Sequence, residues 1–322
     1  MTYDAHGVLL DSELFLPEQS PSEELGADCV LRLFPPSIQA RPSHPWQLER
    51  PTAAGGVRFC TVKDAEDYLI RFPDLADFHI RSGGREIRCV PTPDTPDELL
   101  GHLLLNHVLP LSLTTLGRLV LNASAVEIAE RAIVFVGPSG AGKSTVADAL
   151  YQQGGTLLAD GYLVVDNNDG TPQAPKGSAT DRGWSPRDTV ARRKTPTPGG
   201  WSRTGGPVSI ERIYVLEPLE STTDGGVTVT PALKRAACME LIKSVVQLDG
   251  ADPAATCRSV NHVEWLASSC AVSRLQFAKD TRQLPSMIDA VASDCRTSER
   301  VQPSATQAVA ARASDMESQT TA

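Results

Sequence analysis

Eight residues, GPSGAGKS at positions 137–144, constrain this chain more than any other segment. They fit the pattern G-x-x-x-x-G-K-[ST]. The apolar run AIVFV precedes them, as expected of a buried strand, and a helical pattern follows from Lys143 to about Gln153. Glycines let successive backbone N–H groups turn toward a phosphate, and the start of a helix adds a positive dipole end. The pattern therefore predicts a strand, loop and helix that bind phosphate groups.

The loop also predicts what its residues do. We expect Lys143 to bridge the outer phosphates of a nucleoside triphosphate and the Ser144 hydroxyl to ligate Mg²⁺. ATP and Mg²⁺ are thus the expected cofactors. The other residues expected to contact the nucleotide are Gly137, Pro138, Ser139, Gly140, Ala141, Gly142 and Thr145.

A phosphate-binding loop does not choose a reaction. A carboxylate on a neighbouring strand is needed as well, either to hold Mg²⁺ or to accept a proton from an attacking hydroxyl. Asp160 follows the apolar run TLLA, so the sequence predicts that it stands at the end of a strand, with a capping or turn role as the alternative. Asp166 is the rival carboxylate, but the hairpin-type turn NNDG follows it and favours a surface role.

The remaining pattern predicts an α/β protein in which a phosphate-binding domain follows a smaller, strand-rich N-terminal domain. Residues 1–95 form the strand-rich domain, residues 96–295 the second domain, and residues 296–322 a disordered tail that lacks large apolar runs. An amphipathic helix from Asp97 to Leu109, ended by Pro110, bridges the two domains. The strand-like runs of the first domain are at 8–10, 30–34, 57–62, 78–80 and 87–90.

Composition excludes several classes of function. The chain has 39 acidic and 30 basic residues, a balance that argues against nucleic-acid binding. Its longest apolar runs are far below the roughly 20 residues of a membrane span, and no targeting segment is readable, so we expect a cytoplasmic protein without a membrane partner. The seven cysteines contain no CxxC pair and predict neither a zinc site nor a disulfide framework. The sequence leaves open whether the protein forms a homo-oligomer.

Two basic features have two interpretations each. Residues 171–206 carry seven Lys or Arg against two Asp, together with Trp184 and Trp201. The segment is either a mobile loop that covers an extended substrate or a solvated insertion. Arg274, in a strand-like run near the end of the chain, either reaches a phosphate or has a structural role.

Three pieces of the sequence resemble a known family in their order and spacing: RLVLNASAVEI at 118–128, AIVFVGPSGAGKSTVADAL at 132–150 and GGTLLADGYLVVD at 154–166. They resemble the C-terminal catalytic domain of HPr kinase/phosphorylase and its smaller relatives, including the HPr-kinase-like proteins of peptide-modification systems. The resemblance implies a sheet akin to that of phosphoenolpyruvate carboxykinase. It also implies transfer of the ATP γ-phosphate to a serine hydroxyl.

The resemblance implies further roles for individual residues. Asp160 matches the first of two adjacent aspartates of the family and is the implied base, whereas Gly161 stands in place of the second. Asn122 stands where the family has a histidine; it can donate a hydrogen bond to a phosphate but cannot carry a proton at neutral pH. The expected catalytic residues are Asp160, Lys143 and Asn122, with Ser144 and Asp160 as metal ligands.

The function that follows is a serine kinase acting on a peptide or small protein, with the N-terminal domain docking the substrate. The replacements at Asn122 and Gly161 leave an alternative open, an ATP-binding regulatory or scaffold protein without efficient transfer. A kinase of a small molecule is a further alternative. An Asn-Lys-x-Asp guanine-reading motif is absent from the sequence, which makes a GTPase the weakest candidate.

Overall fold

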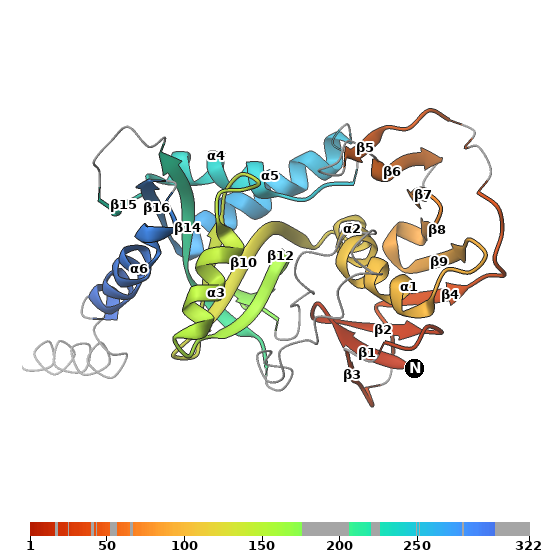
Figure 1. The fold of residues 1–322 in the computed structure, drawn as a ribbon, viewed down its shortest axis with the longest axis horizontal. Helices are drawn as coiled ribbons and strands as arrows, with labels where there is room; N and C mark the ends of the chain where they lie inside the picture. Colours follow the sequence, from red (N-terminus) through yellow and green to blue (C-terminus); the bar gives the residue numbers. More distant parts are fainter. Residues whose placement is uncertain are drawn as a thin grey trace, which may run out of the picture.

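The protein has the α/β fold that the sequence predicts, with two sheets and helices packed on them (Figure 1). The computed structural model describes residues 1–16, 19–24, 26–39, 42, 44–51, 57–64, 67–175, 206–219, 226–248, 250, 252–278 and 280–299. Figure 1 shows the first sheet, red to orange, at one end of the molecule and the second sheet toward the other end.

The first sheet contains nine strands within the described residues. They are β1 (Thr2–Ala5), β2 (Val8–Ser12), β3 (Ser20–Pro21), β4 (Cys29–Leu33), β5 (Leu48–Pro51), β6 (Val57–Asp64), β7 (Asp67–Phe72), β8 (Ala76–Arg81) and β9 (Glu86–Pro91). Their order is β3-β1-β2-β4-β9-β8-β7-β6-β5. The pairs β2–β4 and β4–β9 are parallel, and the others are antiparallel.

The five strand-like runs predicted for this part of the chain fall on β2, β4, β6, β8 and β9. The strands β1, β3, β5 and β7 were not predicted. In β7 each second residue is buried, which is the period-2 alternation of a half-buried strand. Its charged residues, Asp67 and Arg71, lie on the less buried side. They interrupt the apolar run, which is why the sequence pattern did not indicate a strand here.

The bridging helix does not end at Pro110, so that prediction was wrong. It continues as α1 (Asp97–Leu103), a π-helical segment (Leu104–Val108) and α2 (Leu109–Thr115). A proline has no N–H to donate and is tolerated in the first turn of a helix, which is where Pro110 lies in α2.

The second sheet contains seven strands within the described part of the chain. They are β10 (Leu119–Ile128), β11 (Arg131–Val136), β12 (Thr156–Asn168), β13 (Thr171–Ala174), β14 (Val208–Leu219), β15 (Thr228–Pro231) and β16 (Ala271–Ala278). Their order is β11-β10-β12-β13-β14-β16-β15, and β11 also pairs with β14 in parallel. Strand β13 pairs with β12 and with the start of β14. Because β11 pairs with β14 as well, strands β10 to β14 close into a ring.

Two pairs of helices cover the two faces of this sheet. They are α3 (Lys143–Gln152) with α6 (Leu284–Glu299), and α4 (Lys234–Ser244) with α5 (Pro253–Ser269). Buried side chains of α3 and α6 share one cluster with Phe135 and Tyr214 of the sheet. Those of α4 and α5 share another with Leu121 and Ile213. Alternate residues of a strand therefore meet different helices.

Alpha-helices α1 and α2 pack into the first sheet, and their core reaches the second. This cluster contains the buried leucines of both helices together with Val120, Val164 and Leu248. Val120 belongs to β10 and Val164 to β12. The division into residues 1–95 and 96–295 stays a prediction.

Three element boundaries differ from those expected. TLLA and YLVVD are parts of one strand, β12, because the pairing with β10 continues through Gly161, which has φ 108°. The apolar pattern at 263–268 predicts a helix near Val263, whereas α5 begins at Pro253, since Asp252 caps it and Pro253 occupies its first turn. Helix α6 extends to Glu299, past the predicted start of the tail at residue 296.

The turn NNDG does join two antiparallel strands, as expected. Asp169 and Gly170 have positive φ, and Asn168 pairs with Thr171. Among the helices that the structure describes, none is long and apolar enough to cross a membrane.

The contact between Gly84 and α2 gives a test of how the first sheet meets its helix. A Cβ on Gly84, at φ +95°, would lie 2.4 Å from Thr115 Oγ1 and 2.5 Å from Ser112 O, whereas a Cβ on Gly83, at φ +64°, would meet no atom within 4 Å. We expect Gly83→Ala to cost about 1–2 kcal/mol of unfolding free energy through backbone strain alone. Gly84→Ala should cost about 1–3 kcal/mol more through overpacking. Urea unfolding measures both, and equal losses would contradict the packing described.

Candidate functional site

The predicted phosphate-binding loop, residues 137–144, leaves the sheet at the end of β11, beside β14. Val136 pairs with Val215, so the next residue, Gly137, lies against Leu216. Gly137 has φ +147°, and a Cβ there would stand 3.0 Å from Leu216 O. A side chain would thus meet backbone that cannot move aside cheaply, and glycine is required at the point where the loop begins.

The loop then turns tightly and exposes its backbone. The Ala141 amide donates to Pro138 O at 3.1 Å, and Gly140 and Gly142 have φ +79° and +97°. Ala141 is buried beneath the loop, while residues 138–140 are exposed. The conformation therefore needs its glycines for backbone geometry and presents accessible main chain at the N-terminus of α3.

Lys143, the first residue of α3, folds back over this loop. Its Nζ donates to Gly137 O at 2.9 Å and to Pro138 O at 3.2 Å. Burial lowers the pKa of the Lys143 ammonium, and the negative charge of Asp160 acts in the opposite direction. The side chains of Ser144 and Thr145 are exposed in the first turn of the helix. Lys143 is thus held at the loop by two backbone carbonyls.

Asp160 is held by a neighbouring strand. In the β10–β12 ladder it lies opposite Ser124, whose Oγ donates to Asp160 Oδ1 at 2.6 Å. Both residues are buried. Asp160 lies within β12 and not at the end of a strand, so the predicted strand end was wrong. The short bond to a buried hydroxyl fixes the orientation of the carboxylate.

Asn122 and Gly161 lie next to this pair. Asn122 is exposed and faces Tyr162 across the ladder, two residues along each strand from Ser124 and Asp160. Because alternate residues of a strand point to the same side, Asn122, Ser124, Asp160 and Tyr162 share one face. Gly161 lies opposite Ala123 and contributes no side chain.

Ser124 is the site residue that the sequence analysis missed. Its signal was available, since Ser124 is two residues beyond Asn122 in a run that alternates as a strand does. What the sequence did not provide is the β10–β12 register that places Ser124 opposite Asp160. The register contains an irregularity at Ala125 and Val126, which shifts the pairing by one residue just beyond Ser124.

The other two candidate groups have partners elsewhere. Asp166 accepts a hydrogen bond from Arg118 Nη1 at 2.5 Å, and burial, opposed by that cation, raises the pKa of its carboxyl. Arg274 of β16 makes an ion pair with Glu217 of β14 at 3.3 Å. Both side chains thus serve ion pairs between neighbouring elements.

The residues present suit the expected nucleotide and metal. The loop combines a glycine whose replacement by a larger residue would meet backbone with a half-buried lysine, which is the chemistry of a phosphate cradle. Within the described residues no group of three or more His, Cys, Asp or Glu could hold a metal ion. Mg²⁺ that binds with nucleotide phosphates needs only one or two protein ligands, and Ser144 and Asp160 stay the predicted ones.

The basic segment lies mostly outside the described residues. Only its ends, Thr171–Pro175 and Gly206, belong to the structure, so neither interpretation of residues 176–205 is tested. The same holds for the tail from residue 300 onward.

Neither a family model nor a curated protein matches the chain. A solved structure with a similar arrangement is that of the Hpr(Ser) kinase/phosphatase from Coxiella burnetii. The match covers 56% of this chain and 92% of the other, with 12% sequence identity and a TM-score of 0.31. The function proposed below therefore rests on the residues of the site and on the motifs of the sequence.

The Ser124–Asp160 bond can be measured with a double-mutant cycle. Ser124→Ala should cost about 1.5–3 kcal/mol of unfolding free energy, because it removes a hydrogen bond to a buried charged group. The same substitution in an Asp160→Ala background should cost much less. Urea unfolding of the four proteins gives the coupling energy, and additive losses would contradict a stabilising bond. Ser139→Ala, in the exposed loop, is the control and should change stability by less than about 0.5 kcal/mol.

Proposed function

We propose that the protein is an ATP-dependent phosphotransferase that phosphorylates a serine hydroxyl of a peptide or small protein. The observation that carries the proposal is the convergence of two groups of opposite charge. Lys143 is hydrogen-bonded to the loop that follows β11, and Asp160, on β12, is oriented by Ser124, with β10 between these two strands. A phosphate-binding lysine next to an oriented carboxylate is the pairing that phosphoryl transfer needs.

Each residue has a chemical task in this proposal. Ser124 Oγ donates a hydrogen bond to Asp160 Oδ1 at 2.6 Å. The second carboxylate oxygen, Asp160 Oδ2, accepts the proton of the acceptor hydroxyl. The hydroxyl oxygen then bonds to the γ-phosphorus while the bond from that phosphorus to the bridging oxygen of ADP breaks, and the proton on Asp160 passes to solvent. Lys143 and the loop amides stabilise the charge on the transferred group.

Ser144 is the proposed metal-holding residue, because its hydroxyl is exposed in the first turn of α3, next to the loop. When bound, Mg²⁺ supplies charge neutralisation on the outer phosphates. Asp160 is the second proposed ligand if it does not act as the base. Asn122 is exposed on the same face, and its amide is proposed to donate a hydrogen bond to a phosphate oxygen.

The acceptor class is supported by the sequence resemblance, in which the relatives transfer phosphate to serine. The N-terminal sheet is proposed to dock the acceptor, because its residues contribute nothing to the loop or to the Ser124–Asp160 pair. The cytoplasm remains the proposed compartment, and a homo-oligomer remains open.

A second candidate function is an ATP-binding module that transfers phosphate slowly or not at all. The exposed Asn122 and the side-chain-free Gly161 favour it, because each removes a titratable group beside Asp160. Without a neighbouring histidine, protonated Asp160 has fewer groups to which it can transfer its proton.

Transfer of label from γ-labelled ATP distinguishes the two functions. We expect wild-type protein to label a serine-containing acceptor and Asp160→Asn to lose about 10²–10⁴-fold in rate, because the amide cannot accept the proton. Titration of Mg²⁺ separates the roles of Asp160. An unchanged metal dependence in the variant identifies a base, and a weakened one identifies a ligand. Tight ATP binding by wild-type protein without transfer to any acceptor would contradict the kinase and favour the module.

Lys143→Met should separate nucleotide binding from folding. Burial disfavours the charged ammonium, so its loss should leave unfolding free energy within about 1 kcal/mol of wild type, while ATP affinity falls at least about ten-fold. Calorimetric titration with ATP and thermal unfolding measure the two effects. Lys234→Met removes an equal charge from an exposed position of α4 and should leave ATP affinity unchanged. Equal affinities in all three proteins would rule out Lys143 as a phosphate ligand.

A further inference from the structure

A two-residue turn in the first sheet contacts both the bridging helix and the second sheet. Ala5 of β1 pairs with Val8 of β2, so His6 and Gly7 form the turn between them, with φ 55° and 72°. Positive φ at both central positions is the geometry of a type I′ hairpin turn. In Figure 1 this hairpin lies next to α1 and α2, and its turn points toward the second sheet.

The His6 side chain supplies a hydrogen bond that the bridging helix cannot make for itself. In the π-helical segment the Leu109 amide donates to Leu104 O, a step of five residues. The same step from Leu105 reaches Pro110, which has no N–H to donate. His6 Nε2 lies 2.9 Å from Leu105 O. Because a carbonyl oxygen only accepts, Nε2 carries the proton, and His6 fills the gap that Pro110 leaves.

The other nitrogen of this imidazole is buried. Nδ1 has no hydrogen-bond partner among the residues that the structure describes, and His6 is 3% exposed. Ala5, Val8 and Leu105 around it belong to the apolar cluster of the first sheet. Burial lowers the pKa of the His6 imidazole, and the bond to Leu105 O opposes this effect. A proton on Nδ1 would add a positive charge and an unpaired donor to an apolar core.

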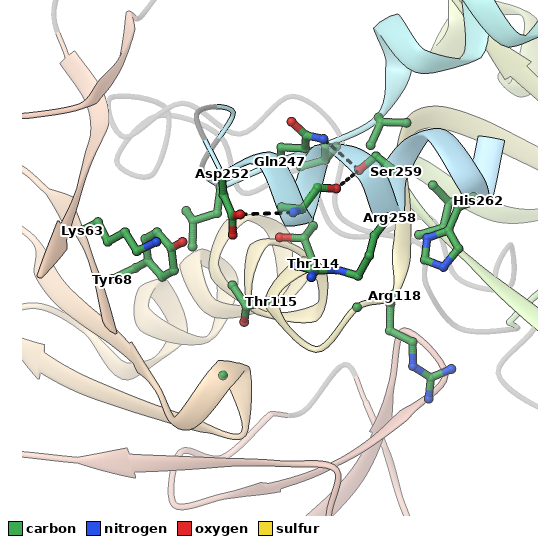
Figure 2. A pocket seen from close by; sticks show the side chains of 17 residues that line it. Lys63, Tyr68, Thr114, Thr115, Arg118, Gln247, Asp252, Arg258, Ser259 and His262 are labelled. Atoms are coloured by element: carbon green, nitrogen blue, oxygen red, sulfur yellow. Dashed lines mark hydrogen bonds between the residues drawn. The ribbon is translucent and has the colours of Figure 1, made fainter. Parts of the chain in front are cut away.

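Gly7 makes the contact with the second sheet. A Cβ on Gly7 would lie 2.7 Å from Pro175 Cβ and 3.1 Å from Asp166 Oδ2. Asp166 is held in turn by Arg118, whose side chain points out of the pocket that Figure 2 shows. Asp166 and the candidate base Asp160 both belong to β12. The turn therefore joins the bridging helix to the strand that carries Asp160.

We infer that the His6–Gly7 turn is an acid-sensitive clamp between the N-terminal hairpin, the bridging helix and the end of β12. With His6 neutral, the turn holds the helix through Leu105 O and β12 through the close packing of Gly7. When Nδ1 takes up a proton from solvent, the charged ring leaves the apolar core and both contacts are lost. The inference does not depend on the proposed kinase activity.

Other titratable and charged groups lie around the turn, on its own hairpin, on the link to β4, on the bridging helix and on the second sheet: Asp4, Glu24, Asp28, His102, His107, Arg118 and Asp166. Burial raises the pKa values of Asp4 and Asp166. These two carboxyls bind protons more readily in the folded state, so their titration stabilises the fold as the pH falls.

His6 has the opposite sign. Its lowered pKa means that the unfolded or released chain binds a proton more readily than the folded one. The stabilisation it contributes is complete above its ordinary pKa of 6.5 and is lost as the pH falls from there through its lowered pKa. A variant that cannot titrate at position 6 therefore separates the effect of His6 from that of the carboxyls.

Hydrogen exchange of the full-length protein measures the clamp at the hairpin itself. Exchange over residues 2–12 is compared at about pH 7.5 and about pH 5.5 as protection factors, which remove the intrinsic effect of pH. We expect protection in wild type to fall by up to about ten-fold, because opening binds one additional proton over the pH unit below 6.5. His6→Gln keeps a donor for Leu105 O and cannot titrate, so its protection should not fall.

His79→Gln is the matched control, because it removes a histidine of β8 whose pKa burial also lowers. Its hairpin should lose protection as wild type does. His6→Asn is a second variant that cannot titrate, since asparagine tolerates the positive φ of this turn.

Three results would overturn the inference. The first is protection of the wild-type hairpin that acid leaves unchanged. The second is an equal loss of protection in wild type and in either variant at position 6. The third needs no variant: NMR of the wild-type imidazole should show His6 titrating only together with the loss of protection, and a protonated His6 in a protected hairpin contradicts the clamp.

Discussion

The candidate site depends on the antiparallel pairing of β10 with its two neighbours. β11 pairs with one edge of β10 and leads into the phosphate-binding loop, while β12 pairs with the other edge and carries Asp160. Since register fixes which side chains face each other, these two ladders place the start of the loop and the carboxylate relative to β10. The Ser124–Asp160 hydrogen bond forms only in this register.

Much of this arrangement could be predicted from local sequence. The strand, glycine loop and helix are encoded by adjacent residues, and the turn at Asp169 and Gly170 is a two-residue signal. What could not be predicted depends on contacts between distant residues. Pro110 is a helix breaker in isolation, yet the π-helical segment before it is stabilised by burial against the first sheet. Ser124 is an ordinary strand serine until the register places Asp160 opposite it.

The shared hydrophobic cluster of the first sheet has a mechanical consequence. Val120 of β10 and Val164 of β12 are buried in the same core as α1, α2 and the N-terminal strands. These two residues flank, along their strands, the segment that holds Asn122, Ser124, Asp160 and Tyr162. A rigid-body swing of one sheet against the other would expose this core to water, at a cost of about 25 cal/mol for each Å² of apolar surface. A hinge between the two sheets is therefore disfavoured as a route of access to the proposed nucleotide site.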